Sequence, residues 1–247
     1  MTNFVLVPGY WLGAAAWQDV TDALCAEGHD VHPVTLTGMA ERASEAGPDT
    51  GLDTHIADIV RVIVDNDLTD VVLVAHSYGG SPATGVADRI PDRLARVVFV
   101  DSGPLPDGVA QGDMGGPEGR AYLEGLAGDG WRMPLPSWDD VANTMQASLE
   151  GLDDTALARF RAMAADQPLR TATQAIRLTG PGIGDLPCDL VACSFPLPVV
   201  REMIAAGHPF FAALGGPQWR LFELPTGHWP MFSRPKDLAA LLIEITN

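Results

Sequence analysis

The sequence predicts an α/β protein whose mostly parallel sheet is flanked by helices and interrupted by an inserted helical cap. Three observations support this fold class. Short apolar runs alternate with helical patterns over residues 1–101 and again over 188–246. The apolar runs show no polar alternation, which is typical of parallel strands buried on both faces. Between the two stretches the alternation stops, which indicates an insertion.

Four strands and three helices are expected before the interruption. Gly28 ends the first helix, and the third begins at about Tyr78 and stops at Pro91. The order βαβαβαβ makes these strands parallel neighbours in one sheet. The expected strands are 3–8, 29–36, 70–75 and 95–101, and the expected helices are 14–27, 53–66 and 78–90.

The interruption is too long to be a plain loop. Residues 103–137 are rich in Gly and Pro, and helices are expected at 138–148 and 153–165. A structureless loop of this length is uncommon in a compact domain, so a cap or lid is predicted. Strands then follow at 188–194 and 219–224, each before a helix, the last at 234–246. The chain therefore divides into a core of residues 1–102 and 187–247 and a cap of 103–186.

Charge excludes several partners. The 247 residues include 32 acidic and 15 basic ones, a net charge of -17, which repels nucleic acids and anionic membranes. The N-terminus has no basic n-region, and no apolar span reaches ~18 residues, so a cytoplasmic protein is expected. The expected partner is a small-molecule substrate. The oligomeric state stays open, with a homodimer among the allowed states.

The three cysteines are expected to be free. Cys25, Cys188 and Cys193 have no metal-ligand spacing, and the last two would point to opposite faces of one strand. Packing in the core is the expected role. The sequence predicts no disulfide, no metal and no cofactor.

Ser77 follows a buried strand in the run VVLVAHSYGG, residues 71–80. Small residues at 75, 79 and 80 allow a turn too tight for larger side chains, which would expose the Ser77 hydroxyl. This is the nucleophile-elbow pattern G-x-S-x-G with Ala75 at the first Gly position. The alternative is that Ser77 only caps the following helix.

A serine nucleophile needs a base, and His228 is the best candidate among the six histidines. It lies in LPTGHWPMF, between the last strand and the last helix, which places it at the same sheet edge as Ser77. His76 neighbours Ser77 along the chain, but adjacent side chains on an elbow diverge, so packing is expected there. Ordinary structural roles are expected for the others.

Two backbone amides are expected to form an oxyanion hole. Tyr78 supplies the amide after the nucleophile, and Tyr10 supplies one from PGYWLGAAAW after the first strand. Gly9 and Gly13 would let this backbone approach a substrate. Alternatively, Pro8-Gly9 is only a turn dipeptide.

These motifs resemble the α/β-hydrolase superfamily. More closely, FVLVPGYWLGAAAWQDVTDALCAEGHDVHPVTLTG, LVAHSYGG and GHWPMFSRPKDLAALLIEI resemble the plant methylesterase and hydroxynitrile lyase group and its bacterial esterase relatives. The resemblance implies an α/β-hydrolase fold and covers both ends and the middle of the chain. Pro8 replaces the group's histidine before Gly9. The Thr and Lys on which the lyases depend are absent, so cyanohydrin cleavage is not expected.

The acid departs from the group's pattern. The group carries an Asp in a stretch like CTEDxxIP, but residues 193–198 read CSFPLP without a carboxylate. Asp189 lies at the wrong end of that strand. Some superfamily members place the acid after the strand that follows the nucleophile helix, where this chain has Asp101. Asp101 is therefore the expected partner of the histidine. Asp107 is second choice, and a turn-capping Asp101 is the alternative.

The leading hypothesis is a serine hydrolase that cleaves an ester, thioester or lactone through an acyl-enzyme, in the carboxylesterase-like EC 3.1 class. Ser77, His228 and Asp101 would be catalytic, with Tyr10 and Tyr78 as the oxyanion hole. A bulky apolar or aromatic substrate would contact side chains of the cap and first loop, although such residues are also common in cores. The candidates are Trp11, Tyr122, Trp131, Met133, Trp138 and Met145.

Two other functions stay open. His228 and Asp101 could act as a general base without an acyl-enzyme, as in C-C bond hydrolases and cofactor-free oxygenases of the same fold. A non-catalytic small-molecule-binding protein is the third hypothesis, which only the missing acid in CSFPLP supports.

Overall fold

A six-stranded sheet forms the centre of the computed structural model, which describes residues 1–128, 130–208 and 211–247. Every strand pairs in parallel with its neighbours, in the order β2-β1-β3-β4-β7-β8. The expected α/β fold with a parallel sheet is confirmed. The strands are β1 (Asn3–Val7), β2 (Asp30–Pro33), β3 (Val71–His76), β4 (Leu94–Val100), β7 (Cys188–Ala192) and β8 (Trp219–Glu223).

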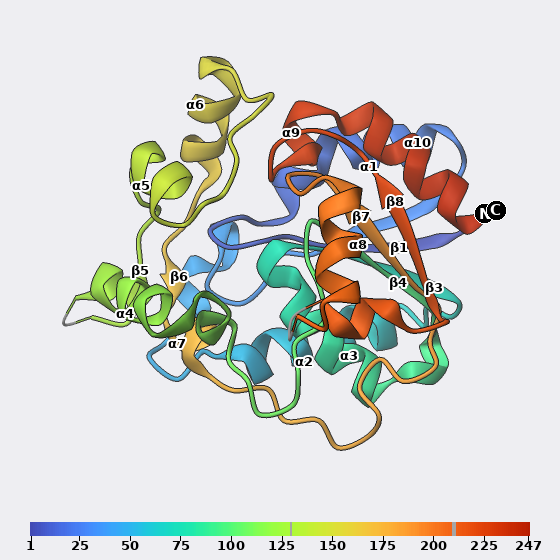
Figure 1. Ribbon diagram of the computed structural model, residues 1–247, viewed down its shortest axis with the longest axis horizontal. Helices are drawn as coiled ribbons and strands as arrows, with labels where there is room; N and C mark the ends of the chain where they lie inside the picture. The colour runs from blue at the N-terminus through green and yellow to red at the C-terminus, as the bar shows by residue number, and fades with distance from the viewer. Residues whose placement is uncertain (129, 209–210) are drawn as a thin grey trace.

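Helices cover both faces of the sheet (Figure 1). On one face, α1 (Gln18–Ala26) packs beside α10 (Pro235–Thr246), with the short α9 (Pro230–Ser233) near them. On the other face lie α2 (Leu52–Asp65), α3 (Gly80–Arg89) and α8 (Leu197–Ala205). The 3-10 turns are η1 (Ala14–Trp17), η2 (Ala40–Glu45), η3 (Ser77–Gly79), η4 (Pro91–Arg93), η5 (Gln111–Gly115) and η6 (Ala212–Gly215).

The core divides into two apolar layers because alternate strand residues face opposite sides of the sheet. Val5 and Val7 of β1 pack into the layer under α2 and α3. Phe4 and Leu6 of the same strand pack into the layer under α1 and α10. Fully burying such a side chain stabilises the fold by roughly 1.5–3 kcal/mol. The two layers make the strands a rigid support for the loops at their carboxyl ends.

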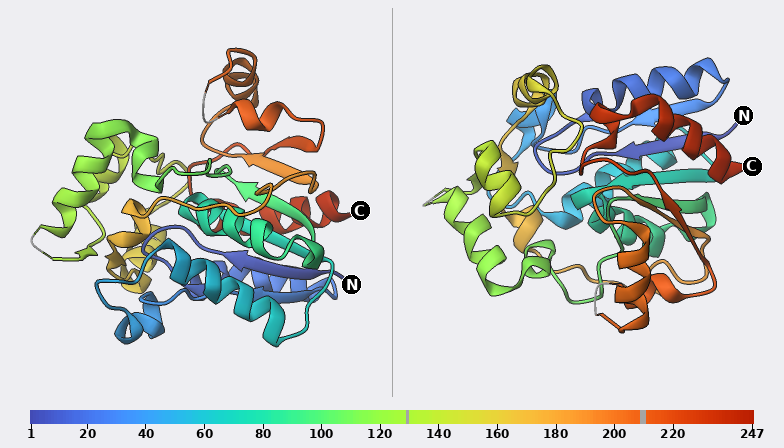
Figure 2. Two further views of the ribbon diagram at one scale, coloured as in Figure 1. Left: turned by 90° about the horizontal axis from the view of Figure 1, so that it is seen from below. Right: turned by 45° about the horizontal axis from the view of Figure 1, so that its top comes forward.

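The order of strands reverses between β1 and β3, because the chain goes from β1 to one edge and returns to the other side of β1. Ligands of open parallel sheets bind at the carboxyl ends of the strands beside such a switch point. Both chain termini lie at the opposite end of the sheet (Figure 2). A ligand site is therefore expected among the loops after β1, β3 and β4.

The segment between β4 and β7 lies over this functional end (Figures 1 and 2). Its two short strands pair in antiparallel fashion, Arg132 with Pro168 and Met133 with Gln167. The division into a core of 1–102 and 187–247 and a cap of 103–186 stays a prediction. The segment's elements are α4 (Gly116–Ala127), β5 (Arg132–Met133), α5 (Trp138–Asn143), α6 (Asp154–Met163), β6 (Gln167–Pro168) and α7 (Arg170–Thr173).

Three expectations about local structure are corrected. Helix α4 lies where an irregular stretch was expected, since its glycines hid a start with Pro117 at the first turn and Glu118 beside it. The helix expected over 138–148 ends at Asn143, because Gln146 has a φ of 56° and cannot continue it. Strand β2 ends at Pro33, which lacks an N–H, rather than at residue 36.

The cysteines are free, but only two are buried. Cys188 and Cys193 lie in the core as expected, whereas Cys25 is exposed on α1 and does not contribute to it. Of the helices formed by residues 1–128, 130–208 and 211–247, none combines the length and apolar character that crossing a membrane needs.

Ion pairs of the buried Asp189 connect three strands of the sheet and are expected to stabilise the fold. Its carboxylate is fully buried and contacts Arg96 Nη1 at 2.5 Å and Arg220 Nε at 2.7 Å. We expect Asp189→Ala to lower the free energy of unfolding by about 3 kcal/mol, because two guanidinium groups lose their partner. The matched control is Glu124→Ala, which breaks an exposed pair with Arg120 and should cost under about 1 kcal/mol. Equal urea midpoints for both variants would contradict this prediction.

Candidate active site

Ser77 lies on a sharp turn directly after β3, with its backbone in the left-handed region at a φ of 51°. The turn needs glycines around it. A Cβ on Gly79 would lie 2.9 Å from the carbonyl oxygens of Val7 and Pro8, and a Cβ on Gly80 would clash with Ser102 Oγ. The elbow therefore presents the hydroxyl because α3 packs closely against the loops after β1 and β4.

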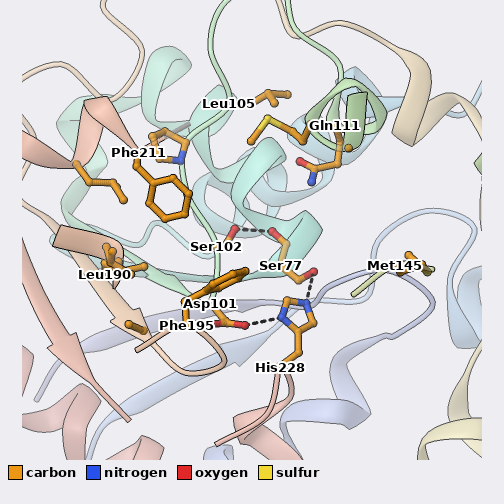
Figure 3. A pocket seen from close by; sticks show the side chains of 17 residues that line it. Ser77, Asp101, Ser102, Leu105, Gln111, Met145, Leu190, Phe195, Phe211 and His228 are labelled. Carbon is orange, nitrogen blue, oxygen red and sulfur yellow. Dashed lines mark hydrogen bonds and ion pairs between the residues drawn. The ribbon is translucent and has the colours of Figure 1, made fainter. Parts of the chain in front are cut away.

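Ser77, His228 and Asp101 form one chain of hydrogen bonds (Figure 3). His228 Nε2 lies 2.8 Å from Ser77 Oγ, and His228 Nδ1 lies 2.6 Å from Asp101 Oδ2. A carboxylate only accepts, so Nδ1–H donates to Asp101 and Nε2 is left to accept from the Ser77 hydroxyl. The three residues come from the ends of β3, β4 and β8, and the fold brings them together.

Asp101 is held on three sides. Its Oδ1 accepts from the backbone N–H of Cys193 at 3.0 Å and of Ser194 at 2.9 Å, and its Oδ2 accepts from the Ser194 hydroxyl at 2.6 Å. Burial raises the pKa of Asp101, but the hydrogen bonds from His228 and Ser194 outweigh it and lower the pKa below its ordinary value. The carboxylate is therefore charged while only 2% exposed.

His76 supports the histidine from the other side. Its Nε2–H donates to the backbone carbonyl of His228 at 2.6 Å. Burial, together with the nearby His228 ring, lowers the pKa of His76 to about 3, so this side chain stays neutral. Packing is the role expected for His76, and this hydrogen bond also positions the loop that carries His228.

The two tyrosines expected to supply oxyanion donors are packed against each other. The rings of Tyr10 and Tyr78 stack with centroids 4.4 Å apart and 13° between their planes. His55 Nε2–H donates to the Thr37 carbonyl at 2.9 Å, so its Nδ1 accepts from the Tyr78 hydroxyl at 2.8 Å. The hydrogen bond to His55 therefore fixes the Tyr78 ring of the stacked pair in place.

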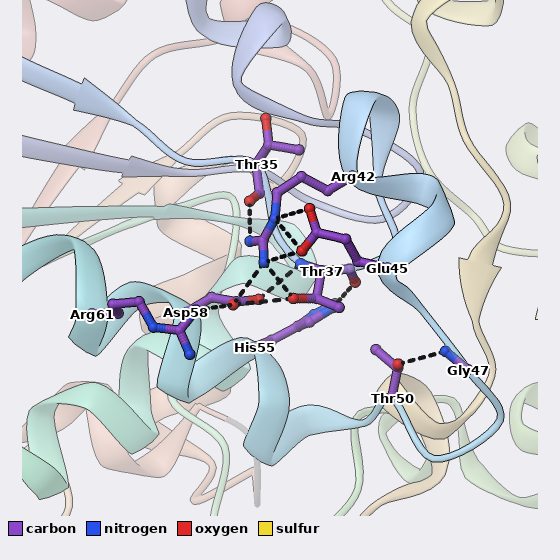
Figure 4. A network of polar contacts seen from close by, with 9 residues as sticks. All are labelled: Thr35, Thr37, Arg42, Glu45, Gly47, Thr50, His55, Asp58 and Arg61. Atoms are coloured by element: carbon purple, nitrogen blue, oxygen red, sulfur yellow. Dashed lines mark hydrogen bonds and ion pairs between the residues drawn. The ribbon is translucent and has the colours of Figure 1, made fainter.

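A polar network of α2 and the loop after β2 lies behind His55 (Figure 4). The buried carboxylate of Asp58 accepts from the Thr37 backbone N–H at 2.8 Å and from the Thr37 hydroxyl at 3.1 Å. Arg42 donates to the same hydroxyl and pairs with Asp58. Thr37, and with it the carbonyl that His55 uses, is thereby fixed in place.

Trp11 ties the loop after β1 to the inserted segment. Its backbone N–H donates to Gln167 Oε1 at 3.1 Å, and its carbonyl accepts from the Ala165 N–H at 2.8 Å. Its indole N–H donates to the Met133 carbonyl at 3.1 Å. Like Ser77 and Asp101, it has a positive φ, here 65°. The loop that carries Tyr10 is therefore held by the segment above it.

Two cavities of unequal size meet at Ser77, His228 and Met145. The larger, of about 380 Å³, is mostly apolar, and the smaller, of about 40 Å³, lies beside Tyr10 and Trp11. Apolar residues of the larger cavity include Met114 and, labelled in Figure 3, Leu105, Met145, Leu190, Phe195 and Phe211. The smaller is completed by Val141, Ala147 and Trp229.

Met145 lines both cavities and Trp11 the smaller one, whereas four other predicted contact residues lie outside both linings. Met133 on β5 is buried in the larger apolar cluster, and Tyr122 packs partly buried against that cluster. Trp138 stacks on Phe160, and Trp131 lies against the Arg132 guanidinium. The sequence cannot distinguish an aromatic side chain that packs from one that lines a cavity.

The sequence motifs do not predict several residues that line or support the site. Gln111 lines the larger cavity, Ser194 holds Asp101, and the Ser102 hydroxyl donates to the Ser77 carbonyl at 2.5 Å. Ser102 and Ser194 lie at the ends of β4 and β7, which is the signal that could have found them. Across the described part of the chain, no group of three or more His, Cys, Asp or Glu side chains is arranged to hold a metal ion.

The comparisons agree with this architecture. A family model described as the alpha/beta hydrolase family matches residues 4–241. The carbendazim hydrolyzing esterase of Nocardioides sp. (strain SG-4G) is 45% identical over 102 residues, 41% of this chain and 42% of that protein. Methylesterase 7 of Arabidopsis thaliana is 27% identical over 260 residues, 99% of this chain and 96% of that protein. This chain thus matches less than half the length of the first relative.

Solved structures share the fold. An extracellular alpha/beta-hydrolase from a Paenibacillus species, described as homologous to tobacco salicylic acid binding protein 2, superposes with a TM-score of 0.78 at 23% identity, over 99% of both chains. An Arabidopsis methylesterase superposes with a TM-score of 0.72 at 18% identity, over 100% of this chain and 99% of that one. These structures show the shared α/β-hydrolase fold, and the curated methylesterases agree with the resemblance to the plant methylesterase group.

His55 makes stability depend on pH. Burial lowers the pKa of His55 from 6.5 to about 4, so the unfolded chain binds a proton here that the folded chain does not. Stability is therefore full above about pH 6.5 and falls as the pH drops towards 4, by on the order of 3 kcal/mol. We expect a shallower fall for His55→Asn, measured by urea unfolding between pH 4 and 7. His76 is present in both proteins, so its contribution to the pH dependence cancels when the two are compared. Parallel plots of the free energy of unfolding against pH for wild type and His55→Asn would contradict this prediction.

Proposed function

The chain belongs to the alpha/beta hydrolase family, and we propose that it is a serine hydrolase that cleaves an ester through an acyl-enzyme on Ser77. The observation that carries this is the continuous hydrogen-bonded chain from Ser77 Oγ through His228 to Asp101. A histidine so placed takes the hydroxyl proton as the oxygen attacks. The esterases among its relatives support the same bond type.

The reaction has two halves. Ser77 Oγ bonds to the carbonyl carbon while its proton moves to His228 Nε2, and the tetrahedral intermediate collapses as the leaving alcohol takes that proton. Water then attacks the acyl-enzyme, giving its proton to His228 Nε2, and Ser77 leaves with it as the free hydroxyl. Asp101 accepts from Nδ1–H throughout and stabilises the imidazolium cation.

The oxyanion of each intermediate is stabilised by the backbone N–H groups of Tyr10 and Tyr78. Such preorganised donors stabilise charge that develops only in the transition state. The stacked rings and the hydrogen bond from Tyr78 to His55 support this assignment, because they hold the two side chains in place and so restrain the backbone that carries the two N–H groups. Trp11 restrains the first loop from above.

The unequal cavities favour a methyl ester of a bulky apolar acid. The space of about 40 Å³ suits a group of the size of a methoxy, and the space of about 380 Å³ suits a ring or branched chain. Relatives named methylesterase support this choice. A thioester or lactone of similar shape remains compatible with the same chemistry. The segment 103–186 acts as the cap, since it supplies Leu105 and Met145.

A fluorophosphonate probe separates this proposal from its rivals. We expect one covalent adduct by intact mass on the wild type and none on Ser77→Ala, because the nucleophile is missing. His228→Ala should label at least a hundredfold more slowly, since its serine has no general base. Absence of an adduct on folded protein would favour a base-only reaction of His228 or simple ligand binding, and would overturn the proposal.

The choice of acid has its own test. We expect Asp101→Asn to lower kcat on a methyl ester by roughly 10³–10⁴-fold, since the amide cannot hold the required tautomer of His228. The KM should change little, because substrate does not need this carboxylate. The matched control is Asp107→Asn, whose carboxylate accepts from the Leu178 N–H on the surface. Equal rates for the wild type and Asp101→Asn would refute the assignment.

A further inference from the structure

Gln111 is the remaining polar group of the large cavity. Five of the described lining residues have polar side chains, and Ser77, His228 and Asp101 belong to the proposed catalytic chain. The hydroxyl proton of Ser102 is used by the Ser77 carbonyl. The amide of Gln111 is left among apolar walls, turned into the cavity on the side of Ser77 (Figure 3).

One end of this amide is already fixed. The Ser81 hydroxyl, almost fully buried in α3, donates to Gln111 Oε1 at 2.5 Å. With its oxygen used in this way, the amide directs its nitrogen, which has two N–H donors, away from α3. Among the described residues, no hydrogen bond from Gln111 Nε2 is formed. A donor such as this N–H, which lines an apolar site and forms no hydrogen bond to the described residues, can set the orientation of a ligand.

The backbone under Gln111 is rigid enough to direct that nitrogen. Gln111 opens η5, where the Ala110 N–H donates to Asp113 Oδ2 at 3.0 Å and Asp113 pairs with Arg120. Next to it, a Cβ on Gly112 would lie 3.1 Å from the Ala172 carbonyl, so this turn packs closely on α7. Binding geometry held by such supporting contacts discriminates between ligands.

We infer that Gln111 is a specificity-determining residue, whose Nε2–H donates a hydrogen bond to an acceptor on the bulky half of the substrate. Ser81 lies four residues after Ser77 in the chain, so its hydrogen bond holds Gln111 close to the nucleophile. The substrate class is an ester whose bulky half is apolar except for one neutral acceptor, such as a ring nitrogen or an ether or carbonyl oxygen. This inference rests on the ester hydrolysis proposed above.

The test compares methyl phenylacetate with methyl 2-, 3- and 4-pyridylacetate. We expect at least one pyridyl ester to gain about three- to tenfold in kcat/KM relative to the phenyl ester. In Gln111→Glu, which can still accept from Ser81 but has no N–H to donate, that ratio should fall by the same factor at pH 8. Comparing this kcat/KM ratio between the two proteins removes the difference in intrinsic reactivity between the esters.

Met114→Leu is the matched control, because it changes an apolar residue of the same cavity. Its pyridyl-to-phenyl ratio should equal that of the wild type. Thermal midpoints and fluorophosphonate labelling establish that each variant is folded with an active serine. A ratio that is the same in wild type and Gln111→Glu for all three isomers would overturn the inference.

Dissociation constants of the matching N-methylamides separate this inference from the proposed reaction. They are expected to show the same pyridyl preference, lost in Gln111→Glu, whether or not any ester is cleaved. Preference in binding without ester turnover would uphold the role of Gln111 and refute the proposed reaction. Ester turnover without a pyridyl preference in either measurement would refute the role of Gln111 alone.

Discussion

The rest of the site depends on the carboxylate of Asp101. It accepts two backbone N–H groups and the hydroxyl of Ser194 at the end of β7, and it holds His228 from the end of β8. Three strand ends are thereby joined around one buried charge. The stretch CSFPLP, residues 193–198, has no carboxylate and instead supplies donors to the acid at the end of the neighbouring strand. Its hydrogen bonds are what allow a carboxylate to stay charged in this buried place.

Three strained backbone positions lie at the carboxyl end of the sheet. Trp11, Ser77 and Asp101 all have a positive φ, and each follows a strand of the parallel sheet. Such conformations persist only where the surroundings determine them fully. The two apolar layers hold the strands, Gly79 and Gly80 allow close approach, and the inserted segment binds Trp11 through its backbone and indole. Close packing and hydrogen bonds therefore hold these three residues in their strained conformation.

Two buried neutral histidines show how polar groups can support the site without taking part in its chemistry. His76 fixes the loop of His228, and His55 fixes the hydroxyl of Tyr78. Burial lowers the pKa of both, so both side chains stay neutral near neutral pH. The same burial costs stability in acid. Stability and site geometry are thus linked through the same side chains.

Sequence alone determined the parallel α/β fold and brought Ser77, His228 and Asp101 to one sheet edge, because apolar periodicity and the position after a strand are local signals. It could not find helix α4, whose glycines hide a helical segment, nor separate lining aromatics from packed ones. Ser194 and Gln111 acquire their roles from partners distant in the chain. Only the tertiary structure decided these, because hydrogen-bond partners and cavity walls are set by packing between segments that no local pattern connects.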